Sequence, residues 1–211
     1  MIVRKTIQTM TLDSLFEQLK HPNPNLRKRA MLEIAEVRDE TTIPRLMNNL
    51  EAEDVVYRRA SVKTLGVIGI DAVSPLVDSL LNSDNATVRS SCAKALAQII
   101  VNYPEVPLPS EGIEGLKKAI NDPNPVVYIA AVMALGEVGS PALDLLLEAL
   151  QTTDNVAIAV TIINSLGSMG DPRAIETLNQ LSNDESADPY IRESAVSALS
   201  RLEMVMKYNQ D

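Results

Sequence analysis

Cysteine, histidine and the larger aromatic residues are nearly absent from this sequence. Its 211 residues include one cysteine, one histidine, one phenylalanine and no tryptophan. A single Cys92 cannot form a disulfide within the chain, which fits a reducing compartment, so we expect a cytoplasmic protein. One histidine and one cysteine also exclude a metal site built from these two residue types, and we expect no bound metal. There is no glycine-rich phosphate loop and no nucleophile elbow, so no self-contained catalytic set is visible.

Positive charge and long apolar runs are also scarce. The chain has 19 Lys and Arg residues against 28 Asp and Glu residues, which gives a net charge of −9. An acidic chain is a poor generic partner for nucleic acid. No uninterrupted apolar run approaches the roughly 20 residues of a membrane-spanning helix, and residues 1–10 lack the apolar core of a signal peptide. We therefore expect neither nucleic acid nor a membrane as a partner.

Residues 112–139 show the unit from which the chain is built, a short helix, a turn and a longer helix. Ile113, Leu116 and Ile120 lie three or four residues apart, so they share one face of the short helix. The segment 122–125, Asp-Pro-Asn-Pro, ends that helix because proline lacks an N–H and restricts the residue before it. Two helices this short cannot bury enough apolar surface alone, so the pair needs similar pairs as neighbours.

The unit recurs six times along the chain. We call the recurring apolar residue in the first turn of each longer, second helix its anchor. The anchors follow one another at spacings of 31, 31, 39, 31 and 33 residues, at Leu26, Tyr57, Val88, Val127, Ile158 and Ile191. A period in this range is typical of a solenoid of stacked helix pairs. We expect one all-α solenoid over residues 12–203, with tails at 1–11 and 204–211. The one longer spacing predicts a protruding, proline-containing loop near 101–111.

The second helices resemble the HEAT-like repeat. The resemblance is carried by Val88-Arg89, Cys92-Ala93 and Ala95-Leu96, by the corresponding residues from Ile191 to Leu199, and by an aspartate or asparagine before each second helix. The link Gly170–Ala174, Gly-Asp-Pro-Arg-Ala, is similar to links in the cyanobacterial phycobiliprotein bilin lyase and lyase-chaperone group. The resemblance covers residues 12–203 and implies a right-handed α-solenoid of about six HEAT-like helix pairs.

Resemblance to that group implies a bilin lyase subunit or a lyase-associated chaperone. Such a protein binds a linear tetrapyrrole (a phycobilin) as substrate rather than as a permanent cofactor, and a phycobiliprotein subunit as client. It assists thioether attachment to a client cysteine, and a second HEAT-like subunit is an expected partner. The alternative is a non-catalytic protein-binding scaffold or assembly factor that uses its concave groove. Whether the chain is itself an enzyme stays open, since the client would supply the nucleophile.

The resemblance to HEAT-like arrays implies that the second helices line the concave surface, and two positions of each helix are then expected to face the groove. They lie two and six residues after the anchor, one turn apart, and are mostly basic in the first three units and mostly apolar in the next two. The predicted ligand- or partner-binding residues are Lys28, Arg59, Lys63, Lys94, Tyr128, Ile129, Met133 and Val160. The cations would hold the two propionates of a tetrapyrrole, and the apolar residues its body. The competing interpretation is that Ile129 and Val160 pack against neighbouring repeats.

Other recurring residues have structural explanations. The arginines that follow the anchors, Arg27, Arg58, Arg89 and Arg192, are predicted to bond turn carbonyls or aspartates in a ladder along the stack. The aspartates that precede the second helices, Asp54, Asp84, Asp122, Asp154 and Asp188, are predicted to cap them. Cys92 occupies the small-residue position of its helix, so we expect a buried, inert thiol rather than a site of bilin attachment.

Overall fold

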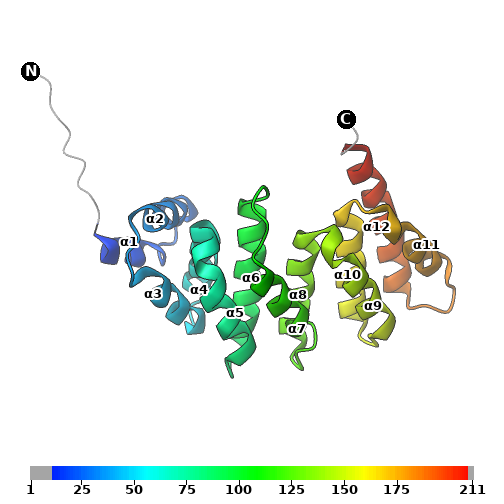
Figure 1. Ribbon diagram of the computed structural model, residues 1–211, viewed down its shortest axis with the longest axis horizontal. Helices are drawn as coiled ribbons and strands as arrows, with labels where there is room; N and C mark the ends of the chain where they lie inside the picture. The colour runs from blue at the N-terminus through cyan, green and yellow to red at the C-terminus, as the bar shows by residue number, and fades with distance from the viewer. Residues whose placement is uncertain (1–10, 209–211) are drawn as a thin grey trace, which may run out of the picture.

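The computed structural model describes residues 11–208, which form twelve α-helices in six consecutive pairs (Figure 1). The first helices are α1 (Leu12–Gln18), α3 (Thr42–Asn48), α5 (Val73–Asn82), α7 (Ser110–Ala119), α9 (Leu143–Thr152) and α11 (Ile175–Asn183). The second helices are α2 (Pro24–Val37), α4 (Val55–Ile68), α6 (Ala86–Asn102), α8 (Pro125–Val138), α10 (Val156–Met169) and α12 (Pro189–Tyr208). Short 3₁₀ turns are η1 (Asn49–Glu51), η2 (Gly69–Ala72), η3 (Ser140–Ala142) and η4 (Pro172–Ala174). The predicted all-α solenoid of six helix pairs is confirmed.

The ends of the described chain differ from the predicted tails. Thr11 caps α1 through its hydroxyl, which accepts from the Ser14 N–H, whereas the rest of the predicted tail at 1–11 lies outside the described residues. At the other end α12 continues to Tyr208, so residues 204–208 are helical rather than a tail. Met206 packs against the core there, and no proline or glycine interrupts the helix. Residues 209–211 lie outside the described residues.

Asparagine, more often than aspartate, caps the second helices. The side chains of Asn23, Asn85, Asn124 and Asn155 accept from backbone N–H groups in the first turns of α2, α6, α8 and α10. Asp54 and Asp188 make the corresponding bonds for α4 and α12. The predicted caps Asp84, Asp122 and Asp154 are wrong, because these helices begin one or two residues later and an asparagine occupies the cap position.

The second helices form the more closely packed layer of the solenoid. They contact one another at every step, from α2–α4 to α10–α12, whereas among the first helices only α5 and α7 make a comparable contact. Gly167 shows how close the approach is, because a Cβ there would lie 2.7 Å from the Cα of Ala198 on α12. In a curved stack the more closely packed layer is the inner one, so we infer that the second helices line the concave side.

The segment Val55–Asn82 is long and apolar enough to cross a membrane by length and hydropathy alone. In the structure it is not one straight helix, because α4 ends at Gly69, whose φ is +82°, and α5 begins after the η2 turn. The side chains of Leu65, Leu76 and Leu80 are buried in the common core. The apolar character of this segment is therefore accounted for by two successive helices, α4 and α5, that bury side chains in the core.

The loop between α6 and α7, residues 103–109, has an exposed middle and anchored ends. Residues 104–107 are exposed, whereas Leu108 is buried. The Tyr103 hydroxyl donates a hydrogen bond to the Val67 carbonyl of α4, and its ring lies against Gly69. A Cβ at Gly69 would come within 2.8 Å of that ring. Tyr103 thus holds the end of α6 against α4.

Tyr103→Phe is expected to lower the free energy of unfolding by about 1 kcal/mol, because the Val67 carbonyl loses its side-chain donor while the ring contact is retained. Urea denaturation monitored by circular dichroism measures the change. Tyr190→Phe is the matched control, since Tyr190 is 71% exposed and its hydroxyl has no hydrogen bond among the described residues. Equal losses in the two variants would show that the Tyr103 hydroxyl does not stabilise the fold.

Candidate functional site

A groove of about 830 Å³ runs over α2, α4 and α6 on the inner layer. We call it the basic groove, because it is lined by cations and, within residues 11–208, by no aspartate or glutamate. These cations are Arg27, Lys28, Arg58, Arg59, Lys63 and Lys94. One groove thus gathers six of the 19 basic residues of a chain whose net charge is −9.

Apolar side chains share this groove with the cations. Leu32 is 50% exposed, Val55 43% and Val56 42%, and all three line it together with Met31. Exposed apolar side chains that gather in one groove are typical of a surface that binds a ligand or partner. The groove therefore offers both a cationic and an apolar surface, which suits an amphipathic anion.

The cations of the basic groove are poorly compensated. Burial, and then the charges of Arg58 and Arg59, lower the pKa of Lys94 below its usual value. Over residues 11–208, no ion pair is formed by Lys28, Arg59, Lys63 or Lys94. A bound anion would relieve this repulsion, so the groove is electrostatically prepared for a negatively charged ligand.

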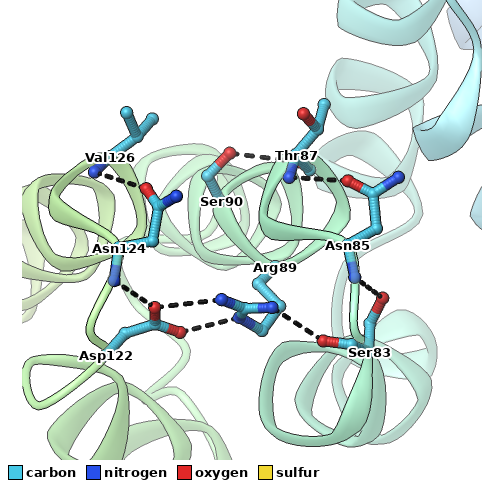
Figure 2. Close-up of polar contacts among 8 residues, drawn as sticks. All are labelled: Ser83, Asn85, Thr87, Arg89, Ser90, Asp122, Asn124 and Val126. Atoms are coloured by element: carbon cyan, nitrogen blue, oxygen red, sulfur yellow. Dashed lines mark hydrogen bonds and ion pairs between the residues drawn. The ribbon is translucent and has the colours of Figure 1, made fainter.

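The arginines next to the anchors have a different role, the predicted ladder. Each donates to a carbonyl of the turn before its own helix, namely Arg27 to His21 and Pro22, Arg58 to Ala52, Arg89 to Ser83, and Arg192 to Glu185. Arg89 also reaches the next repeat, where its Nε and Nη2 lie 2.7 and 3.0 Å from the two carboxylate oxygens of Asp122 (Figure 2). The ladder is therefore structural. Arg27 and Arg58, which also line the basic groove, each use one guanidinium nitrogen, Nη1, for these bonds.

Half of the sequence-predicted site residues meet in the basic groove. Lys28, Arg59, Lys63 and Lys94 line it. Tyr128, Ile129 and Val160 do not, and they are only partly exposed; Tyr128 and Ile129 pack against the core, and burial raises the pKa of Tyr128. For Ile129 this packing favours the competing interpretation over a place in a shared ligand site.

Met133, the remaining predicted residue, lies in a second hollow. It is 54% exposed and lines a space of about 470 Å³ over α8, α10 and α12. Arg201 also lines this hollow, but its guanidinium donates to the Asn164 carbonyl and the Ser168 hydroxyl. The structure thus separates Met133 from the predicted cations, whose groove lies over the three preceding second helices.

The apolar wall of the basic groove was not among the predicted residues. Leu32 lies four positions after Lys28 on the same face of α2, and Val55 and Val56 follow the cap Asp54 in the first turn of α4. The sequence signal was present, since two valines that precede the anchor Tyr57 have no place in the core pattern. Whether these valines line the same groove as Lys94 of α6 depends on how the repeats stack.

Cys92 is fully buried in α6, and burial raises its pKa to about 12. A thiol in this state is neither accessible nor ionised at neutral pH, as its position in the repeat predicted. In residues 11–208 no group of three His, Cys, Asp or Glu side chains is arranged to hold a metal ion.

Cys92→Ser is expected to leave ligand binding unchanged and to lower the free energy of unfolding by about 1–3 kcal/mol, because a hydroxyl replaces an apolar thiol in the core. Visible absorbance titration with a phycobilin measures the first quantity, and urea denaturation the second. Loss of phycobilin binding in a variant that retains its fold would contradict the inert role of this residue.

Comparison with known proteins places the chain in a family. A model described as HEAT repeats matches residues 12–97 and 113–200. The uncharacterized phycocyanin operon protein Z of Pseudanabaena tenuis is 56% identical over 202 residues, which are 96% of this chain and all of that protein. The bilin biosynthesis protein CpeZ of a Synechococcus species is 32% identical over 165 residues, 75% of this chain and 88% of the relative.

A solved structure agrees with the fold. The complex of CpcE and CpcF of phycocyanin lyase from a Nostoc species contains a chain with a TM-score of 0.52 to this one. The match is 20% identical and covers 73% of this chain and 96% of that chain. The chain is therefore a HEAT-repeat protein and belongs to the cyanobacterial group that includes phycocyanin operon protein Z and bilin biosynthesis protein CpeZ.

Proposed function

We propose that this protein assists the attachment of a phycobilin to a phycobiliprotein, as a bilin lyase subunit or a lyase-associated chaperone. The observation that carries the proposal is the basic groove, which combines unpaired cations with exposed apolar side chains. A linear tetrapyrrole has the matching chemistry, a long apolar body with two propionates. The name of its relative CpeZ, a bilin biosynthesis protein, supports the same ligand class.

Thioether attachment requires little chemistry from this chain. A cysteine thiol of the client adds across a carbon–carbon double bond of the bilin, so one C–S bond forms and one π bond is lost. The thiol proton ends on the carbon framework, without a leaving group or an oxidant. The client supplies the nucleophile, and the contribution of this protein is to bind the bilin, orient it and keep it from water. The buried thiol of Cys92, whose pKa burial raises to about 12, fits that division of labour.

A second HEAT-repeat subunit is part of the proposal. One similar solved structure is a chain of a complex between CpcE and CpcF. We infer that this chain too acts with another subunit, and that the phycobiliprotein docks where the bilin is presented. Co-purification from cells that express this chain, a candidate second subunit and a phycobiliprotein subunit tests these partners.

The decisive experiment mixes the purified protein with phycocyanobilin or phycoerythrobilin and records the visible spectrum. A reshaped and intensified absorption band is expected, because a bilin held extended in a groove absorbs differently from one coiled in water. The same titration with the candidate second subunit present tests whether two chains are needed. An unchanged spectrum in both cases would favour the alternative, a scaffold whose groove binds another protein.

A further inference from the structure

We propose that the basic groove selects ligands with two separate carboxylates, and that it binds both propionates of a linear tetrapyrrole at once, over α2, α4 and α6. This inference rests on the proposed function and specifies which part of the ligand is recognised and where it lies. It moves the ligand from the centre of the solenoid, where the sequence pattern had placed its apolar contacts, to the first three repeats.

The cations of the groove fall into two sets, according to whether their charge acts on Lys94 of α6. Lys94 of α6 and Arg59 of α4 form the first set, together with Arg58, whose charge also acts on Lys94. Lys28 of α2 and Lys63 of α4, whose charges are not among those that lower the pKa of Lys94, make up the second. α4 contacts both α2 and α6, and packed helices lie about 8–10 Å apart, so a carboxylate beside Lys94 lies about two helix spacings from the axis of α2.

A ligand with a single carboxylate would leave some cations of the basic groove without a counter-charge. An anion at Lys94 offsets the repulsion from Arg58 and Arg59 but leaves Lys28 and Lys63 without a partner among the described residues. No acidic side chain of the groove can take that role in residues 11–208. A second carboxylate on the same ligand therefore adds a charge-assisted contact without a second cost in translational freedom.

The apolar side chains of the groove indicate which class of dianionic ligand it fits. Leu32, Val55 and Val56 are each at least 42% exposed and border the same groove as the cations. A nucleotide or an inorganic anion would leave them uncovered, whereas a ligand with carboxylates on an extended apolar body covers them. An acidic helix of a client protein is the competing occupant, and the experiment below separates it from a tetrapyrrole.

The test is an absorbance titration of the full chain with phycocyanobilin as the free diacid and as its dimethyl ester, in the same cosolvent. We expect the diacid to bind at least about 50-fold more tightly than the ester. Equal affinities would overturn the two-carboxylate inference and leave the proposed function intact. Binding of neither compound, with capture of an acidic client peptide instead, would overturn both.

Two substitutions, one in each set, separate recognition from folding. Lys94→Met and Lys28→Met are each expected to weaken diacid binding about tenfold and to leave ester binding unchanged. Neither should lower the melting temperature, and Lys94→Met should raise it, because it removes a repelled cation. Lys118→Met on α7 is the control, since Lys118 is exposed and outside the groove. Equal losses for diacid and ester, or a loss of binding in the control, would contradict the assignment of carboxylate contacts to these lysines.

Discussion

Replacement of Arg59 and Lys63 by glutamate in one variant is expected to weaken phycobilin binding at least 100-fold without loss of thermal stability. A hydrogen bond to a charged group contributes about 1.5–3 kcal/mol, so two lost contacts correspond to a factor of about 10²–10⁴. Repulsion between the new carboxylates and the propionates adds to this loss. Folding should not suffer, because Arg59 and Lys63 are exposed and form no ion pair in the described part of the chain.

Absorbance titrations at low and high salt measure this effect, and the affinity of the wild-type protein should fall as salt rises. The matched control reverses two exposed lysines outside the basic groove, Lys118 on α7 and Lys207 on α12. It makes the same change in net charge, so it separates a local contact from the overall field. A comparable loss of binding in the control would assign the effect to net charge rather than to contacts in the basic groove.

Asp122→Ala is expected to lower the free energy of unfolding by about 3 kcal/mol, because it leaves Arg89 largely buried without its charged partner. The two side chains are only 14% and 10% exposed, and their contact joins α6 to the turn before α8. Arg38–Asp71 is the natural control, since it also bridges residues 33 positions apart but is exposed on both sides, at 42% and 60%. Asp71→Ala should cost less than about 1 kcal/mol.

The pH dependence of this difference tests its electrostatic origin. Burial alone raises the pKa of Asp122, but hydrogen bonds from Arg89 and from the Asn124 N–H outweigh it, so the pKa lies below its usual value. The stabilisation is therefore complete above the unfolded pKa of about 3.9 and is lost as pH falls further, through the folded pKa. Urea denaturation of wild type and Asp122→Ala should converge below that range. A difference that persists in acid, or one no larger than that of Asp71→Ala, would refute the paired-charge explanation.

Features within one repeat were predictable from the sequence because the helical period fixes which residues share a face. The anchor spacing predicted six helix pairs, and the residue after four of the anchors predicted the bonds to turn carbonyls that Arg27, Arg58, Arg89 and Arg192 form. Within residues 11–208, the predicted ladder along the stack is realised only by Arg89, which also pairs with Asp122 of the next repeat. The same reasoning placed Lys28, Arg59, Lys63 and Lys94 on one surface of three helices. It also identified Cys92 as a buried residue.

Contacts between repeats were decided only by the tertiary structure. Whether Ile129 lies in a groove or against a neighbouring helix depends on how closely successive second helices approach, which small residues such as Gly167 allow. Stacking brings the valines at the start of α4 into the same groove as Lys94 of α6, and it places Met133 in a different hollow. The periodicity determined the faces of the helices, but the rotation and spacing from one pair to the next depend on side-chain packing, and these set the position of the candidate site.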